Sequence, residues 1–297
     1  MTKTAFVAIV GCPNVGKSSL LNRMLGQKVA IVTQKPQTTR TKIMGVLTEG
    51  ETQLVFTDTP GYHRPKTKLG EKMIKAVGDG VTGVDVCLFV TEPEGEVKET
   101  ELELLKRLKA EKAPVVLAIN KIDTVKQKEK LMERIAAFSA VYDFEAVVPV
   151  SALRDENVDL LKDELKKLAY ESVHFFPDDT LTDQPERVLA AEIIREKLLN
   201  LLDDEVPHGV AVCIERMHER EDSNITDIDA TIYCERESHK GIIIGKKGEM
   251  LKKVSTKARE DMERFFMCKI NLHCWVKVKE GWRNREGLIH NFGLDNE

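Results

Sequence analysis

The sequence contains a loop whose residues are suited to hold a polyphosphate. Residues 11–18, Gly-Cys-Pro-Asn-Val-Gly-Lys-Ser, follow the pattern of a glycine, four residues and then Gly-Lys-Ser. Backbone N–H groups of such a loop surround phosphates, and the N-terminus of the next helix adds partial positive charge. We expect Lys17 to reach the β- and γ-phosphates and the Ser18 hydroxyl to bind Mg²⁺. A glycine-rich turn that matches by chance is the alternative, but an apolar strand-like run precedes the loop and a helical pattern follows it.

A second motif and a polar run could complete a metal and γ-phosphate site. In Asp58-Thr59-Pro60-Gly61, the carboxylate of Asp58 can hold Mg²⁺ through its water shell, and the N–H of Gly61 can sense a γ-phosphate. Residues 33–40 are polar and lack apolar periodicity, which is typical of a mobile loop. A threonine hydroxyl of this run could complete the Mg²⁺ coordination when a γ-phosphate is present and so order the run. An ordinary solvated loop is the alternative.

Two later motifs favour guanine as the base. The carboxylate of Asp123 suits two adjacent donors, such as those on the N1 and N2 edge of guanine, which adenine lacks. Asn120 could bond the other edge of the base, the stem of Lys121 could cover its face, and a backbone N–H at Ser151 or Ala152 could reach O6. Each motif is weak alone, but their order at successive strand ends predicts one site for GTP or GDP and disfavours a P-loop kinase or ATPase. The residues expected at the nucleotide are Gly11, Cys12, Pro13, Asn14, Val15, Gly16, Lys17, Ser18, Ser19, Asp58, Gly61, Asn120, Lys121, Asp123, Ser151 and Ala152.

Strand-like and helical patterns alternate up to about residue 170, which predicts an α/β domain with a mostly parallel sheet over residues 1–174. A hairpin at residues 48–51 makes the edge pair antiparallel. The expected strands are residues 5–10, 42–47, 53–58, 84–90, 114–120 and 146–151. The expected helices are residues 18–25, 69–77, 98–109, 126–141 and 158–170.

The remaining sequence predicts a smaller α+β domain. Residues 175–184 break the helical pattern and form the linker, residues 185–281 follow the order helix, strand, strand, helix, helix, strand, and residues 282–297 form a tail. Asp183 and Glu186 predict a capping box at the start of the first helix. The apolar face expected for that helix consists of Val188, Ala191, Ile194, Leu198 and Leu201.

The second domain carries a candidate RNA-binding loop. Residues 186–235 have a net charge of −8 and residues 236–285 a net charge of +8, so a polyanion is the natural partner of the latter. Gly245-Lys246-Lys247-Gly248 lets the backbone pass close to a sugar-phosphate chain, and the preceding isoleucines could form a floor for unstacked bases. A basic surface turn would leave that apolar run and the charge asymmetry unexplained. The residues expected to contact RNA are Ile242, Ile243, Ile244, Gly245, Lys246, Lys247, Gly248, Lys252 and Lys253.

Composition excludes several classes of protein. With 32% charged and 42% hydrophobic residues, and no apolar run near the roughly 20 residues of a membrane span, we expect a cytoplasmic globular protein. The six cysteines form no Cys-x-x-Cys pair, so we expect reduced core thiols and no transition-metal site. Trp275 falls on the polar face of the last strand, where a domain interface and RNA stacking are both open, and Trp282 is expected to anchor the C-terminal segment.

The motifs resemble a known family. GCPNVGKSS, QTTRT, DTPG, NKID and VSA, in this order and spacing, are similar to those of translation-factor-class GTPases. The segments GQK at 26–28 and PQTTR at 36–40 resemble the Era family of bacterial ribosome-assembly GTPases, and the Gly-Lys-Lys-Gly loop in its charged block looks like a type II KH domain. The resemblance spans nearly the entire chain. It implies Thr39 as the Mg²⁺-binding switch threonine, so the expected metal ligands are Ser18, Thr39 and Asp58.

One position departs from the Ras-like pattern. Tyr62 follows the DTPG motif, where Ras-like enzymes carry the glutamine that orients the attacking water, and a phenol cannot replace that amide. The resemblance to GTPases with a hydrophobic residue there implies that Asn14 holds K⁺, with help from Thr33, and that intrinsic hydrolysis is slow. His63 is an alternative base. The expected catalytic residues are Lys17, Asn14, Thr39 and Gly61.

The resemblance also implies partners. It predicts a monomeric GTPase switch that binds small-subunit ribosomal RNA near its 3′ end, binds no DNA, assists maturation of the small ribosomal subunit and associates with the inner face of the cell membrane. The alternative is an RNA chaperone in which GTP is mainly structural, and Tyr62 keeps it open because no water-orienting residue is visible.

Overall fold

The computed structural model describes residues 1–294 except 36, 204 and 222. Position 36 of the predicted polar run and the last three residues of the predicted tail therefore lie outside the described residues. The chain forms two compact units. Unit 1 consists of residues 1–30, 39–66 and 70–183, and unit 2 consists of residues 31–38, 67–69 and 184–297.

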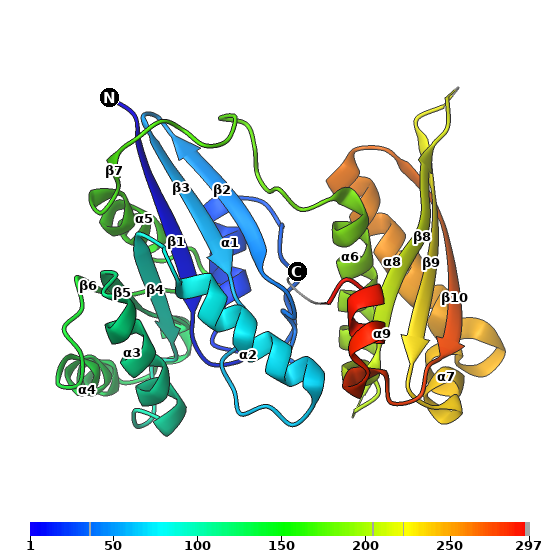
Figure 1. The fold of residues 1–297 in the computed structure, drawn as a ribbon, viewed down its shortest axis with the longest axis horizontal. Helices are drawn as coiled ribbons and strands as arrows, with labels where there is room; N and C mark the ends of the chain where they lie inside the picture. Colours follow the sequence, from blue (N-terminus) through cyan, green and yellow to red (C-terminus); the bar gives the residue numbers. More distant parts are fainter. Residues whose placement is uncertain (36, 204, 222, 295–297) are drawn as a thin grey trace. The chain divides into compact units, whose positions relative to one another are not determined.

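Unit 1 is built on a sheet in the order β2-β3-β1-β4-β5-β6 (Figure 1). The pairs β3–β1, β1–β4, β4–β5 and β5–β6 are parallel, and the hairpin partner β2 is antiparallel to β3, which confirms the predicted antiparallel edge. The bounds are Lys3–Val10 (β1), Ile43–Glu49 (β2), Thr52–Asp58 (β3), Val86–Thr91 (β4), Val115–Ile119 (β5), Ala146–Pro149 (β6) and Tyr170–Glu171 (β7). The short β7 pairs antiparallel with β1, whereas the sequence predicted a helix up to residue 170.

Helices cover both faces of this sheet because its strands are apolar on both sides. In β1, Ala5, Val7 and Ile9 face the core beneath α1 and α5, whereas Ala8 and Val10 face the core beneath α2, α3 and α4. The bounds are Lys17–Leu25 (α1), Lys68–Val81 (α2), Glu99–Glu111 (α3), Lys128–Ser139 (α4) and Val158–Lys167 (α5). The carboxyl ends of β1, β3, β5 and β6 thus carry the four predicted nucleotide motifs along one edge of the sheet.

Unit 2 has the predicted α+β order. Its bounds are Glu186–Leu201 (α6), Ala211–Glu219 (β8), Ile225–Cys234 (β9), Glu237–Ile244 (α7), Glu249–Phe266 (α8), Lys269–Val278 (β10) and Glu286–Asn291 (α9). The sheet order is β10-β9-β8, with β9 parallel to β10 and antiparallel to β8. α6, α7 and α8 share one core with this sheet. Short 3₁₀ helices occur at Ile122–Thr124, Pro207–Gly209, Lys246–Gly248 and Trp282–Asn284.

The face predicted for α6 is wrong at Val188, which is exposed, and right at the other four residues. Ile194 and Leu198 are buried in the core of unit 2, and Ala191 and Leu201 pack against that core. The helix is covered on more than one side, since the polar Arg195 and Glu196 are buried too, so a single apolar stripe does not describe it. The predicted capping box is also wrong, because the N-cap position is Pro185 and no side chain among the described residues caps it.

Part of the predicted polar run lies in unit 2. Glu196 accepts a hydrogen bond from the backbone N–H of Val32 at 3.0 Å, and Arg195 donates to the carbonyl of Thr38. Trp282 is fully buried and its indole N–H donates to the Gly209 carbonyl at 2.8 Å, which confirms its role as a C-terminal anchor. The six cysteines are free thiols, and the described helices include none that is long and apolar enough to cross a membrane.

Candidate functional site

The loop between β1 and α1 has a backbone shape that suits an anion. Gly11, Asn14 and Gly16 have positive φ values of 149°, 63° and 97°, and such alternation turns successive N–H groups toward one side. A Cβ atom at Gly11 would lie 2.2 Å from the Val90 carbonyl oxygen, so only glycine fits there. Within the described part of the chain no side chain caps the N-terminus of α1, so its first N–H groups are not taken by a capping residue.

Lys17 lies inside this loop. Its ammonium donates to the carbonyls of Gly11 at 3.1 Å and Cys12 at 3.0 Å, and the side chain is buried. Burial lowers the pKa of Lys17, whereas the nearby Asp58 carboxylate opposes that shift. The predicted phosphate-binding cation is therefore held at the phosphate loop by the loop's own backbone.

The three predicted metal ligands converge. The Ser18 hydroxyl donates to Asp58 Oδ2 at 2.6 Å and lies 3.0 Å from the Thr39 hydroxyl, and Thr39 Oγ1 lies 3.4 Å from the same carboxylate oxygen. Burial raises the pKa of Asp58 to about 6, against the charge of Lys17 and the two hydroxyl hydrogen bonds, which lower it.

The donor set at this point fits Mg²⁺. Asp58 Oδ1 is buried and has no hydrogen-bond partner among the described residues. An oxygen-only donor set with one unused carboxylate oxygen suits Mg²⁺, which prefers hard oxygen ligands. In the part of the chain that the structure describes, no group of three or more His, Cys, Asp or Glu residues suits another metal.

The motifs predicted to contact the base are tied to one another. Asn120 Nδ2 donates to the Val15 carbonyl at 2.9 Å, and Asn120 Oδ1 accepts from the Ala152 N–H at 3.1 Å. The Ser151 hydroxyl donates to Asp123 Oδ1 at 2.5 Å, which orients that carboxylate. The amide of Asn120 thus joins the ends of β5 and β6 to the phosphate loop, a structural role that the sequence did not indicate, and its direct contact with the base stays a prediction.

The side chain of Tyr62 is part of a core, although its backbone contacts the phosphate loop. Its backbone N–H donates to the Gly11 carbonyl at 3.0 Å, but its ring is 7% exposed and packs in the core beneath α2 and α3. The guanidinium of Arg107 lies 5.2 Å from the ring centroid, and the hydroxyl lies 3.5 Å from Glu103. His63 Nδ1 lies 2.9 Å from the Gly61 carbonyl oxygen.

Unit 2 presents the predicted RNA-binding loop between α7 and α8. Gly245, Lys247 and Gly248 have positive φ values of 74°, 51° and 81°, and the Lys246 and Lys247 side chains are exposed. Ile242 is 49% exposed and Ile244 is partly buried, so both remain candidates for contact with bases. Lys252 and Lys253, on the first turns of α8, are exposed as well.

The prediction for Ile243 is wrong. This side chain is fully buried in the core of unit 2, because it lies on the face of α7 that packs against that core. Trp275 is 49% exposed on β10, with its ring centroid 6.1 Å from that of His273, and both roles considered for it remain open.

Glu92, which the sequence motifs did not indicate, is joined to the predicted nucleotide site by Lys121. The Lys121 ammonium donates to the Asn14 carbonyl at 2.5 Å and to Glu92 Oε1 at 2.7 Å. Glu92 directly follows β4, so it lies at the same edge of the sheet as the predicted motifs. That position after a buried strand was the available signal.

Two family models match the chain. One, described as 50S ribosome-binding GTPase, matches residues 6–121, and the other, described as KH domain, matches residues 205–283. GTPase Era of Clostridioides difficile strain 630 is 49% identical over 297 residues, covering 100% of each chain. GTPase Era of Ruminiclostridium cellulolyticum is 50% identical over 291 residues, covering 98% of this chain and 97% of the relative.

Two solved structures are similar over nearly the whole chain. A single-residue variant of Aquifex aeolicus Era bound to GDP and AlF₄⁻ has a TM-score of 0.95 and 37% identity, covering 99% of this chain and 100% of that one. Era in complex with MgGDPNP and nucleotides 1506–1542 of 16S ribosomal RNA has a TM-score of 0.96 at the same identity and coverage. Both expected folds, the α/β P-loop GTPase domain and the smaller KH domain, are confirmed.

Proposed function

The chain belongs to the Era family of GTPases, and from this premise we propose that it is a GTP-hydrolysing switch that binds small-subunit ribosomal RNA near its 3′ end and assists maturation of that subunit. The proposal rests on the presence of two glycine- and lysine-containing loops in one chain. Residues 11–18 suit a polyphosphate, and residues 245–248 suit a sugar-phosphate chain. The solved Era complex with MgGDPNP and 16S ribosomal RNA supports it.

In unit 1, the nucleotide would lie along the carboxyl edge of the sheet. Lys17 would exchange its two backbone carbonyls for phosphate oxygens, and Asp123, oriented by Ser151, would accept from the guanine edge. Ser18, Asp58 and Thr39 would hold Mg²⁺, which neutralises charge on the β- and γ-phosphates when bound. Changing Asp123→Asn should weaken GTP binding and favour xanthine nucleotides, and an unchanged base preference would reject this assignment.

Water positioning must come from a residue other than Tyr62, because that ring is committed to the core. We assign part of this task to the backbone N–H of Gly61 and to K⁺ held by Asn14, a residue of the phosphate loop with a positive φ. Turnover should then be faster in K⁺ than in Na⁺. Equal turnover in the two salts would remove the cation from the proposal.

In unit 2, RNA would follow the loop of residues 245–248. Its exposed lysines would neutralise phosphates, and Ile242 and Ile244 would contact unstacked bases. The proposed domain bounds are 1–174, 175–184, 185–281 and 282–297. The division of the chain near residue 183 and the residues that the family models match support them. A monomeric state, a cytoplasmic location and peripheral contact with the inner face of the membrane complete the proposal.

The polar run 33–40 supports a switch. Residues 31–38 belong to unit 2, whereas Thr39 lies beside Ser18 and Asp58 of the nucleotide site. Val32 and Thr38, which precede Thr39 in the chain, are hydrogen-bonded to side chains of α6. A γ-phosphate and Mg²⁺ that bind Thr39 would therefore act on the same run of residues that contacts α6.

The deciding experiment measures affinity for an RNA of nucleotides 1506–1542 of 16S ribosomal RNA with GDP and with GDPNP bound. A switch requires different affinities in the two states, because a ligand shifts an equilibrium only through its differential interaction with the two states. Identical affinities would favour the alternative of an RNA chaperone in which GTP is structural.

A further inference from the structure

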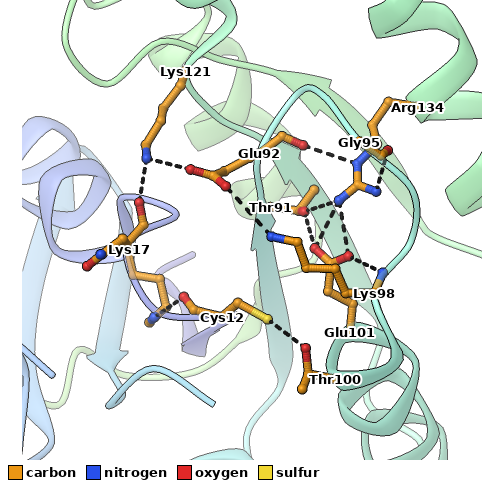
Figure 2. A network of polar contacts seen from close by, with 11 residues as sticks. Cys12, Lys17, Thr91, Glu92, Gly95, Lys98, Thr100, Glu101, Lys121 and Arg134 are labelled. Atoms are coloured by element: carbon orange, nitrogen blue, oxygen red, sulfur yellow. Dashed lines mark hydrogen bonds and ion pairs between the residues drawn. The ribbon is translucent and has the colours of Figure 1, made fainter. Parts of the chain in front are cut away.

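A network of polar contacts joins the turn after β4 to Lys121 and to Arg134 of α4 (Figure 2). Glu92 is the first residue after β4, and its carboxylate joins two lysines from different elements. Its Oε1 accepts from Lys121 at 2.7 Å, and its Oε2 lies 3.9 Å from the ammonium of Lys98. Lys121 donates in addition to the carbonyl of Asn14, so one ammonium links the end of β4 to the phosphate loop.

The backbone of Glu92 is held by Arg134 of α4. The guanidinium donates to the carbonyl of Glu92 at 3.1 Å, to that of Gly95 at 3.0 Å and to the Thr91 hydroxyl at 2.9 Å. These three acceptors span the turn that follows β4. Glu92 therefore projects from a backbone that is fixed by a side chain of a neighbouring helix.

Arg134 is itself fixed by a buried ion pair. Its guanidinium bonds both carboxylate oxygens of Glu101, at 3.0 and 3.1 Å, and the two side chains are 1% and 2% exposed. Glu101 also accepts from the Thr91 hydroxyl at 2.5 Å and from the Lys98 N–H at 2.8 Å, so its lone pairs are well satisfied. A buried pair with this many hydrogen bonds defines one geometry and is destabilising to break. The pair of Arg134 and Glu101 holds both ends of the turn between β4 and α3.

We propose that Glu92 is a positioning residue for the guanine nucleotide: it holds the ammonium of Lys121 against the carbonyl of Asn14, so that the lysine stem lies ready to cover the base. This rests on the proposed contact of Lys121 with the base. The Lys121 side chain is 37% exposed, and a four-carbon stem without its carboxylate partner would spread over several rotamers. Ordering that stem on binding would then cost affinity.

The pair of Glu92 and Lys121 is not an ordinary surface ion pair. Such pairs add little to stability, and this one is expected to add little too. Its effect lies in nucleotide binding, because the same ammonium is also bonded to a residue of the phosphate loop. Preorganisation of a binding residue raises affinity without adding a contact to the ligand.

The test compares Glu92→Ala and Glu92→Gln with Glu94→Ala in the full chain. Glu94 lies two residues further along the same turn, where its carboxylate is 4.0 Å from Lys130 of α4. We expect Glu92→Ala to release fluorescent GDP roughly 10-fold faster, with KM for GTP changing more than kcat, and Glu92→Gln to restore part of the loss because its amide oxygen still accepts a hydrogen bond. Release rates equal to those of Glu94→Ala would overturn the proposal.

A double-mutant cycle separates positioning from general support of the fold. Lys121→Met keeps the apolar stem and removes the ammonium, so Glu92→Ala should add nothing in that background. Additive losses would mean that Glu92 acts through other residues and would reject the inference. Lys121→Ala removes the stem as well, and if it leaves GDP affinity unchanged, the proposed base contact fails. If Lys121→Ala weakens binding and Glu92→Ala does not, only the present inference fails.

Discussion

Two loops of this protein combine glycines, lysines and left-handed backbone residues, and they differ in how their lysines are held. In residues 11–18 the lysine is 6% exposed and is hydrogen-bonded to two carbonyls of its own loop. In residues 245–248 both lysines project from the surface between α7 and α8. Similar residue types therefore produce a closed loop in unit 1 and an open one in unit 2.

The difference follows from the two kinds of ligand. A nucleoside polyphosphate is compact and always presents the same oxygens, so a loop with a fixed lysine can be complementary to it before it arrives. An RNA strand is a flexible polymer, and exposed amines can follow its phosphates without a single geometry. The buried loop should therefore lose affinity for nucleotide when its geometry changes, and the exposed loop should lose affinity for RNA when its charge changes.

The largest effect is expected for Gly11→Ala. A Cβ atom there would lie 2.2 Å from the backbone oxygen of Val90, and neither the loop nor β4 can yield cheaply. We expect affinity for GDP, measured by fluorescent nucleotide titration, to fall by about 100-fold or more. RNA binding by the nucleotide-free protein should stay within about twofold of the parent. A variant that binds GDP normally would show that the phosphate loop is more adaptable than its contacts indicate.

The next effect concerns charge in the open loop. Gly248→Asp places a carboxylate beside Lys247, where RNA phosphates are expected, and should abolish RNA binding in a gel-shift assay while GDP affinity is kept. Gly248→Ala is the matched control, because φ is +81° but no atom of the described residues lies within 4 Å of the added Cβ. It should cost about 1 kcal/mol of strain and keep most of the RNA affinity. Equal losses in the two variants would mean that shape and not charge governs this loop.

A smaller effect is expected from removal of the exposed lysines. In Lys246→Ala/Lys247→Ala, the slope of log affinity for RNA against log salt should decrease by about 1.4, because each phosphate contact to single-stranded RNA contributes about 0.7. Lys17→Ala, in the buried loop, should leave this slope unchanged and abolish nucleotide binding. If Lys17→Ala changes the slope, the two loops do not act on separate ligands.

The smallest effect is expected for the pH dependence of stability, where Asp58 of unit 1 and Asp227 of unit 2 have pKa values shifted in opposite directions. Burial raises the pKa of Asp58 in unit 1, whereas hydrogen bonds from Arg220, at 2.7 and 2.8 Å, and from Asn271, at 2.7 Å, lower the pKa of Asp227 in unit 2 below its ordinary 3.8. A lowered pKa in the folded state means that Asp227 stabilises the fold above about pH 4 and loses this contribution as the pH falls further. The difference in urea midpoint between the parent and Asp227→Asn should shrink from about pH 5 to pH 3. A constant difference would show that the contacts of Asp227 do not depend on its charge.

Much of the nucleotide site could be predicted because its parts are local and the sheet is parallel. Each motif spans at most eight residues at the end of an apolar run, and parallel strands bring those ends to one edge. The convergence of Ser18 and Asp58 therefore followed from sequence order, whereas Thr39 was expected from the resemblance to the Era family. The predicted strands match β1 to β6 within one or two residues at most ends.

The parts that could not be predicted depend on partners far apart in the chain. Arg134 and Glu101 are 33 positions apart, and no periodicity within α3 or α4 distinguishes them from solvated charges. Three consecutive isoleucines do not reveal which one faces the core, so the pattern alone places Ile243 wrongly at an RNA surface. The burial of α6 on several sides, including Arg195, removes the single stripe on which helical periodicity depends.

The two-residue strand β7 has a consequence for how this protein could be taken apart and recombined. Tyr170 pairs with Thr4, Glu171 pairs with Lys3, and the Ser172 N–H donates to the Thr2 carbonyl at 3.1 Å. The beginning and the end of the first domain are thus neighbours. A segment with adjacent ends can be transplanted into another polypeptide, or closed and reopened elsewhere as a circular permutant, with short connections. The termini of the GTPase domain are therefore placed so that the domain could be inserted into another protein.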